Sequence, residues 1–154
     1  MKNKLYILSI FFLTLSGCLW SGLYNKFSYS VEFRNIGTKD IRVKELYLSP
    51  PQDSSKIRSL ELFHGQGATL APFDQEPSKT VSLEWIDLNT KETSQADVKI
   101  QLPILFKNPE YPSFIIFYIN SDNKAIQVAY RVFSQSKCDF IKIDSEGKPF
   151  SLAK

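Results

Sequence analysis

The sequence has few of the residues that build metal and catalytic sites. It contains one histidine, His64, and two cysteines, Cys18 and Cys138. A zinc site needs about three or four imidazole or thiolate ligands, so we expect no metal site and no cofactor. No motif ties an acid to His64, and neither a G-x-S-x-G elbow nor a phosphate-cradling loop is present. We therefore expect no catalytic residues and a protein that is not an enzyme.

An excess of positive charge is also missing. The formal net charge is +3, but Lys2 and Lys4 lie in an N-terminal leader. The rest of the chain has 17 Lys and Arg against 16 Asp and Glu, which leaves +1. The sequence has no dense Lys/Arg cluster, and such a cluster is the electrostatic signature of a nucleic-acid-binding protein. We therefore expect no nucleic-acid partner.

The leader is too short to span a membrane. Its apolar stretch from Leu5 to Leu15 has eleven residues and is broken only by Ser9 and Thr14. A transmembrane helix needs about 20 apolar residues to cross a core of about 30 Å. The stretch follows two lysines and has the length of a signal-peptide hydrophobic region.

Leu15-Ser16-Gly17-Cys18 ends this stretch with a branched apolar residue, two small residues and a cysteine. The segment resembles the lipobox of bacterial lipoproteins, and the resemblance covers only residues 1–18. It implies a signal peptide over 1–17, cleavage between Gly17 and Cys18, and a diacylglycerol on the Cys18 sulfur. The alternative is an uncleaved membrane anchor in which the cysteine is incidental.

The residue after the cysteine bears on the location of the protein. In Gram-negative lipoproteins an Asp at this position retains the protein in the inner membrane, and here the residue is Leu19. The resemblance therefore implies the outer membrane, with the protein facing the periplasm. In a Gram-positive cell it would be anchored to the cell membrane and face outward. Residues 18–26 would form a lipidated tether, in which Trp20, Leu23 and Tyr24 either rest at the lipid interface or pack on the domain.

The lipobox also decides how we interpret Cys138. Because Cys18 is committed to lipid, the two cysteines are not expected to form a disulfide. We expect Cys138 to be a small buried core residue. A reactive thiol or an intermolecular bridge is the alternative.

Residues 27–154 read as one β domain. Alternating polar and apolar side chains predict strands at 28–34, 41–48, 80–88, 98–102, 126–132 and 140–143. The apolar residues change from odd to even positions near Lys44–Glu45, which predicts a bulge. Residues 114–119 are apolar at odd and even positions alike, which predicts a central strand covered on both faces. Residues 57–63 fit either a short strand or one helical turn. We expect a brief strand at 69–70, a loop at 71–78 and a loose hairpin tip at 89–95. We expect an antiparallel β-sandwich of seven or eight strands, with an open curved sheet as the alternative.

Polar loops supply the expected contact surfaces, at 49–56, 64–79, 89–96 and 103–112. The longest carries the candidate binding residues His64, Phe73, Asp74 and Glu76. Asp122 and Asn123 are expected to satisfy only the backbone of their own turn. Trp85 lies on the apolar face of its strand and is expected in the core.

These features predict a protein-binding module anchored to a membrane by lipid. Its partner would be an envelope protein or an incoming protein, as for an immunity or inhibitor lipoprotein. The alternatives are a structural lipoprotein of the envelope or of a secretion system, and a carrier of a lipid or another small ligand.

Overall fold

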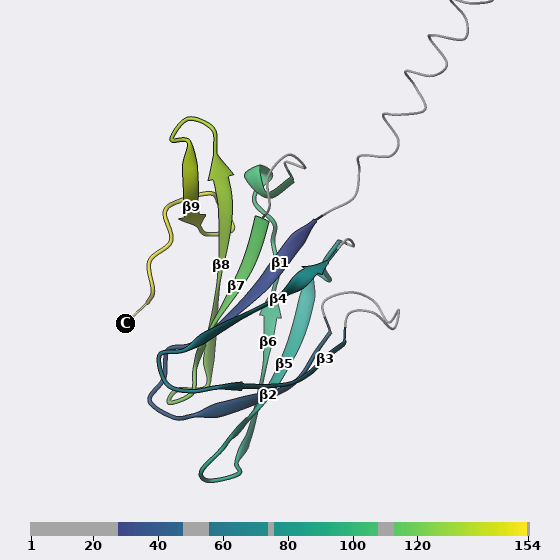
Figure 1. Cartoon of the computed structure of the whole chain (residues 1–154), viewed down its shortest axis with the longest axis vertical. Helices are drawn as coiled ribbons and strands as arrows, with labels where there is room; N and C mark the ends of the chain where they lie inside the picture. The colour runs from purple at the N-terminus through teal and green to yellow at the C-terminus, as the bar shows by residue number, and fades with distance from the viewer. Residues whose placement is uncertain (1–27, 48–55, 74–75, 108–112, 154) are drawn as a thin grey trace, which may run out of the picture.

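The computed structural model describes residues 28–47, 56–73, 76–107 and 113–153. Nine strands and one 3-10 turn account for most of these residues (Figure 1). In chain order they are β1 (Tyr29–Asn35), β2 (Ile41–Tyr47), β3 (Lys56–Leu62), β4 (Gly67–Phe73), β5 (Thr80–Asp87), β6 (Thr93–Lys99), η1 (Ile104–Lys107), β7 (Ser113–Asn120), β8 (Ala125–Ser134) and β9 (Asp139–Ile143). The predicted signal peptide and tether, with Gly17 and Cys18, lie outside the described residues. Within the described ranges, no helix has the length and apolarity needed to cross a bilayer.

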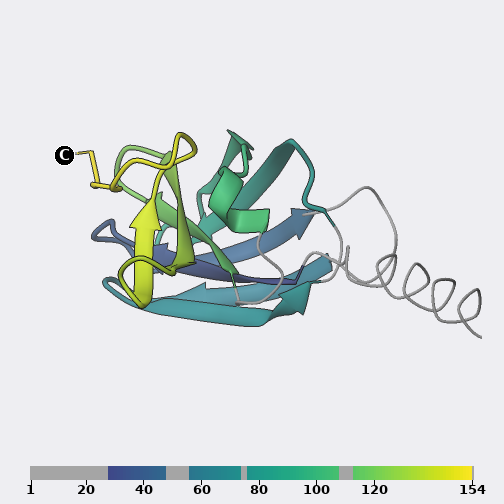
Figure 2. The same ribbon diagram turned by 90° about the horizontal axis from the view of Figure 1, so that it is seen from above.

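The strands form two sheets, which are packed together in layers (Figure 2). One sheet has the order β4-β1-β7-β8-β9 and the other the order β3-β2-β5-β6. The predicted all-β sandwich is confirmed, with nine strands where seven or eight were expected. One pair departs from the antiparallel pattern, because β1 runs parallel to β7, from Tyr29 opposite Ser113 to Asn35 opposite Ile119. Parallel neighbours need a long connection, and the intervening strands β2 to β6 supply it.

Alternating side chains build the core between the two sheets. In β5, Val81, Leu83 and Trp85 are buried, whereas Ser82 and Glu84 on the opposite face are only partly covered. Trp85 is 2% exposed, which confirms its predicted place in the core. Burial of each large apolar side chain stabilises the fold by about 1.5–3 kcal/mol.

The strand β7 is covered on both faces, as its apolar run predicts. Ile115 and Phe117 belong to the core between the sheets. Ile116 and Tyr118 belong to a second, smaller cluster on the outer face. The ring of Phe150, from the C-terminal segment, stacks on Tyr118 with 5.3 Å between the ring centroids. The C-terminal segment therefore covers part of the outer face of the five-stranded sheet.

Several local predictions are settled by the strand pairing. The bulge expected near Lys44–Glu45 is confirmed, since the register of β2 against β5 shifts between Val43 and Glu45. The ambiguous segment 57–63 contributes the strand β3. The loop predicted at 71–78 is wrong in its first part, because β4 continues to Phe73 and pairs there with Tyr29. The loose tip predicted at 89–95 is shorter, because β6 begins at Thr93, opposite Ile86.

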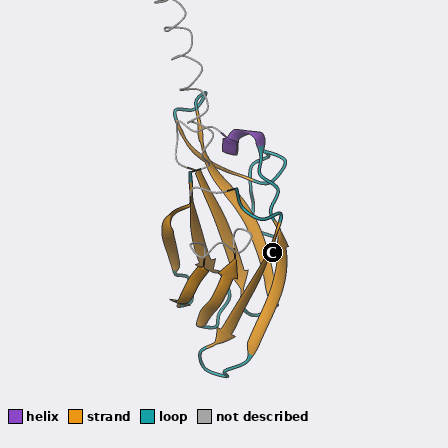
Figure 3. Ribbon diagram, turned by 90° about the vertical axis from the view of Figure 1, so that its right-hand side faces the viewer, coloured by secondary structure: helices purple, strands orange, loops and turns teal. Residues whose placement is uncertain are grey.

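Strand directions give the sandwich two different ends. The described chain enters through Ser28 at the start of β1, and we call this the proximal end. It also carries residues 76–79, the β6–η1 segment and the turn 135–138. Figure 3 shows η1 in purple at this end. The opposite end, the distal end, carries the four connections 36–40, 63–66, 88–92 and 121–124.

Candidate functional site

The distal end joins four loops that come from both sheets. The connections 36–40 and 63–66 cross between the sheets, whereas 88–92 and 121–124 close hairpins within one sheet each. Backbone hydrogen bonds link them, from the Leu88 N–H to the Asp40 carbonyl (2.9 Å) and from the Gly65 N–H to the Asn35 carbonyl (3.1 Å). We call these four loops the distal loop surface. Loops held on a rigid β scaffold are common binding sites, which makes this surface the candidate site.

Asn35, the last residue of β1, holds the β1–β2 connection to the end of β3 from inside. Its side chain is buried, with the residue 1% exposed. The amide nitrogen donates to the carbonyl of Lys39 (2.7 Å) and to that of Leu62 (3.1 Å). The amide oxygen accepts the Gly37 N–H at 3.2 Å. The amide thus satisfies backbone groups of the β1–β2 connection and of β3, groups that burial would otherwise leave unpaired.

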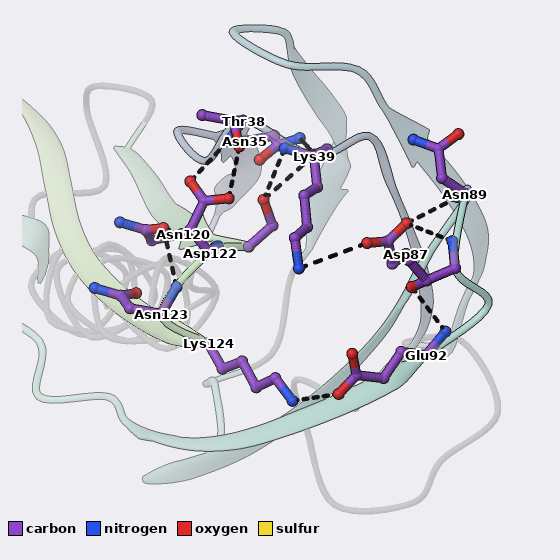
Figure 4. Close-up of polar contacts among 12 residues, drawn as sticks. Asn35, Thr38, Lys39, Asp87, Asn89, Glu92, Asn120, Asp122, Asn123 and Lys124 are labelled. Atoms are coloured by element: carbon purple, nitrogen blue, oxygen red, sulfur yellow. Dashed lines mark hydrogen bonds and ion pairs between the residues drawn. The ribbon is translucent and has the colours of Figure 1, made fainter.

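Asp122 ties the β7–β8 hairpin to the β1–β2 connection (Figure 4). Its carboxylate accepts the Thr38 N–H at 2.9 Å and the Thr38 hydroxyl at 2.7 Å. The hydroxyl and then the backbone N–H of Thr38 lower the pKa of Asp122. The Ser121 hydroxyl bonds to the backbone of Lys39. The loops meet so closely that a Cβ on Gly37 would lie 2.1 Å from the Ser121 hydroxyl oxygen.

Asp87 shapes the β5–β6 turn. One carboxylate oxygen accepts the N–H groups of Asn89 (2.8 Å) and Thr90 (3.0 Å). These two bonds, that of Thr90 first, lower the pKa of Asp87. The other oxygen lies 3.8 Å from the Lys39 ammonium, which reaches over from the β1–β2 connection. Asp87 therefore both forms its own turn and holds it to a neighbouring loop.

Lys124 and Glu92 join the two hairpins of the distal loop surface. The Lys124 ammonium lies 2.5 Å from a Glu92 carboxylate oxygen, and its hydrogen bond lowers the pKa of Glu92. Both side chains are about half exposed, and ion pairs in contact with solvent add little to stability because water screens them. We conclude that the shape of this surface depends mainly on Asn35 and Asp122, with the exposed pair adding to it.

Among the candidate binding residues that the structure describes, His64 alone lies on the distal loop surface. Its N–H donates to the Asp40 carboxylate at 2.9 Å. Its ring Nδ1 lies 2.6 Å from the Gly37 carbonyl oxygen, which can only accept, so the proton of this bond is on Nδ1. The imidazole therefore helps to fix the loop backbone.

Phe73 and Glu76 lie elsewhere, and the prediction that 64–79 is a single loop is wrong because β4 occupies Gly67–Phe73. Phe73 ends β4 and is half-buried, with its ring stacked on Tyr29 at 5.6 Å between centroids. Glu76 is exposed at the proximal end, and Asp74 lies outside the described residues. The strand β4 separates His64 from Phe73 by about 20 Å, at about 3.3 Å for each residue along the strand. The predicted loop at 89–96 is likewise shortened by β6, and the segments 48–55 and 108–112 lie outside the described residues.

Phe63 is a candidate residue that the sequence analysis missed. It follows Leu62, which is buried, and it is 47% exposed beside His64. An exposed aromatic ring within a polar rim is typical of a protein-binding site. The sequence contains the signal. Leu60 and Leu62 face inward, so position 63 is expected to face outward and to be polar, but it is a phenylalanine.

Asp122 and Asn123 are predicted to satisfy only the backbone of their own turn. For Asn123 this is confirmed, because its side-chain oxygen accepts the Ala125 N–H at 3.1 Å. For Asp122 it is wrong, because its carboxylate binds Thr38, which is 84 residues away in the chain. No local pattern shows a pairing across that distance.

Cys138 also departs from its prediction. It is exposed and lies in the β8–β9 turn with φ = 49°, not in the core. The buried face of β8 ends with Ser134, so the four turn residues after it extend beyond the core.

Candidate metal ligands do not cluster in the part of the chain that the structure describes. Nowhere in that part do three or more His, Cys, Asp or Glu side chains gather into a set that could hold a metal ion. At the proximal end, Glu76, Lys79, Lys99 and Leu102 line an open hollow of about 450 Å³. In comparisons with known proteins, no family model, no curated protein and no solved structure matches this chain.

Proposed function

We propose that this protein is a lipid-anchored envelope lipoprotein whose distal loop surface binds a partner protein. The observation that carries the proposal is the position of this surface. Four interlocked loops lie at the end of the sandwich opposite Ser28, where the described chain enters. An anchor attached before Ser28 would leave the distal loops pointing away from the membrane, toward a partner.

The anchor itself is supported by the lipobox Leu15-Ser16-Gly17-Cys18. Two or three acyl chains on Cys18 would give durable membrane attachment, at about 0.8 kcal/mol for each buried CH₂. Leu19 favours the outer membrane, with the domain in the periplasm.

A protein partner fits the surface better than a small ligand does. Phe63 offers an exposed aromatic side chain, and polar side chains such as Lys124 and Glu92 surround the loops. The loops are held by Asn35 and Asp122, so little conformational entropy would be lost on binding. We favour an immunity or inhibitor role, in which a rigid surface blocks one toxin or hydrolase that arrives in the periplasm.

Site-specific photocrosslinking would test the binding surface. The full chain is produced in its host bacterium with a photoreactive phenylalanine at Asn89 or Asn123, both exposed on distal loops. The matched position is Gln95, exposed on β6. We expect one protein to be crosslinked from the two distal positions and not from Gln95. Crosslinking that is equal at all three positions would refute the assignment, and a large multi-subunit product would favour the structural alternative.

A pair of matched phenylalanines tests the aromatic contact. Phe63 and Phe140 are similarly exposed, at 47% and 41%, but lie on different parts of the molecule. We expect Phe63→Ala to weaken partner binding by about 2 kcal/mol, roughly 30-fold in Kd, and Phe140→Ala to leave it nearly unchanged. Equal effects would remove the central role given to Phe63.

A further inference from the structure

We propose that the proximal end is itself a membrane-docking surface, in which η1 inserts two aliphatic side chains into the interface of an anionic phospholipid bilayer. This inference rests on the lipid anchor proposed above and adds a second contact with the same membrane. It assigns a role to the end of the sandwich that the distal loops leave unused.

The turn η1 presents apolar side chains to solvent from a fixed position. Ile104 is 91% exposed and Leu105 is 48% exposed, whereas the next residue, Phe106, is 4% exposed. The ring of Phe106 lies 5.8 Å from that of Tyr29 and 5.7 Å from that of Tyr130, centroid to centroid. Phe106 thus fixes η1 to the core, while the two aliphatic residues before it point outward. A fixed apolar protrusion of this kind suits insertion at the level of the lipid head groups.

Positive charge lies at the same end of the sandwich as this protrusion. Lys79 and Lys99 are exposed and line the proximal hollow, together with Gln101, Leu102 and the carboxylate-bearing Glu76. The Ile100 N–H donates to the Lys79 carbonyl at 2.8 Å, which holds the two lysine-bearing segments together. The segment that carries Lys99 leads directly into η1. Two ammonium groups at the same end of the sandwich as exposed aliphatic side chains match the phosphates and acyl chains of an anionic membrane.

The length of the tether makes the bilayer the occupant of this surface. Nine residues separate Cys18 from Ser28, and a fully extended chain of that length reaches at most about 35 Å. Ser28 and η1 lie at the same end of the sandwich. The anchor therefore holds the proximal end at a high effective concentration next to lipid, and a weak contact is enough for docking.

Depth-dependent fluorescence quenching tests the docking. The full chain is purified and placed in vesicles of phosphatidylglycerol and phosphatidylethanolamine, some of which carry nitroxide-labelled acyl chains. A polarity-sensitive dye is attached at Leu105→Cys or, as the matched distal control, at Asn89→Cys, each in a Cys138→Ser background. We expect the dye at position 105 to be blue-shifted and quenched severalfold more than the dye at 89, at a depth of about 5–10 Å below the head-group boundary. Ile104→Glu is expected to reduce the quenching at 105.

Quenching at position 105 that is no greater than at 89, or that Ile104→Glu does not change, would overturn the docking surface. The mass of the N-terminal peptide reports separately whether Cys18 carries lipid. A lipidated chain with a water-exposed dye at 105 would leave the anchor intact and refute docking. A chain without lipid on Cys18 would refute the anchor, and the same quenching measurement with Cys18→Ser added, so that only position 105 carries dye, would then decide the contact made by η1.

Discussion

Asn35 shows at the scale of a single residue how a small polar side chain organises the distal loop surface. Its amide makes three hydrogen bonds to backbone groups, of which two go to carbonyls, one in the β1–β2 connection and one at the end of β3. The sequence identifies Asn35 as the start of a turn, because Asn, Gly and Asp follow one another closely from there. Its bond to Leu62, 27 residues away, depends on the packing of two sheets and has no local signature.

Replacement of this amide should therefore affect the fold more than its size suggests. We expect Asn35→Ala to lower the free energy of unfolding by about 2–4 kcal/mol, because buried carbonyl and N–H groups lose their partners. Urea unfolding of the purified protein gives this value. Asn123→Ala is the matched control, since Asn123 is exposed and bonds only within its hairpin, and we expect a change within about 0.5 kcal/mol. Similar losses in the two variants would contradict the role assigned to Asn35.

At the scale of elements, the distal loops depend on ionised carboxylates. Hydrogen bonds from Thr90 and Asn89 lower the pKa of Asp87, and those from Thr38 lower the pKa of Asp122. The folded state therefore favours the ionised form of both groups. Their stabilising contribution is complete above the unfolded pKa, near 3.9, and is lost as the pH falls through the lower folded values.

This coupling predicts a specific response to acid. We expect the free energy of unfolding to be nearly constant between about pH 7 and 5 and to fall below about pH 4. Asp122→Asn should be less stable at pH 7 and should show a shallower decline in acid, and Thr38→Val, which removes only the hydroxyl, should lie between the two. Unfolding curves at a series of pH values measure the slopes. An acid slope in Asp122→Asn equal to that of the unchanged protein would exclude this carboxylate as a cause.

The turn η1 contains two adjacent residues with opposite roles, one that anchors the turn to the core and one that faces solvent. We expect Phe106→Ala to destabilise the protein by about 3–5 kcal/mol, because it opens a cavity between Tyr29 and Tyr130. Leu105→Ala, one residue earlier, should change stability by less than about 0.5 kcal/mol. Thermal and urea unfolding compare the pair. A large loss in Leu105→Ala would show that this side chain packs on the domain and would weaken the case for docking.

At the scale of the whole molecule, the C-terminal segment completes the fold on the outside of the five-stranded sheet. Phe150 stacks on Tyr118, its N–H donates to the Lys142 carbonyl, and the side chain of Gln127 bonds to the backbone of Ala153. These contacts cover an outer cluster that contains Ile116. Without them the sheet would expose an apolar patch.

Loss of the Phe150 ring should expose this cluster. We expect Phe150→Ala to reduce stability by about 1–2 kcal/mol and to increase the binding of a hydrophobic dye to the folded protein. Leu152→Ala is the control, because Leu152 is 44% exposed. The expectation fails if both variants bind the dye equally, since the cluster would then be covered by other residues.

The sequence predicts the strands well because each one is decided locally. The alternation of Tyr29, Val31 and Phe33 and the doubly apolar run that contains Ile116 both gave the correct strand and the correct faces. The sequence predicts β4 to be shorter than it is, because Ala71 and Pro72 resemble loop residues. The pairing of β4 with β1 is a long-range contact that these residues do not show. The convergence of four loops at one end is a property of strand order, and the local patterns that identify strands do not contain strand order.

The position of β1 has a mechanical consequence. The strand lies inside the five-stranded sheet, paired with β4 on one side and with β7 on the other. A pull on the chain before Ser28 would act along β1, so both rows of hydrogen bonds would bear the load at the same time, in shear. Unzipping from a sheet edge would break them one after another at much lower force. A domain held by its first strand in this way can resist traction from a bound partner without unravelling from the point of attachment.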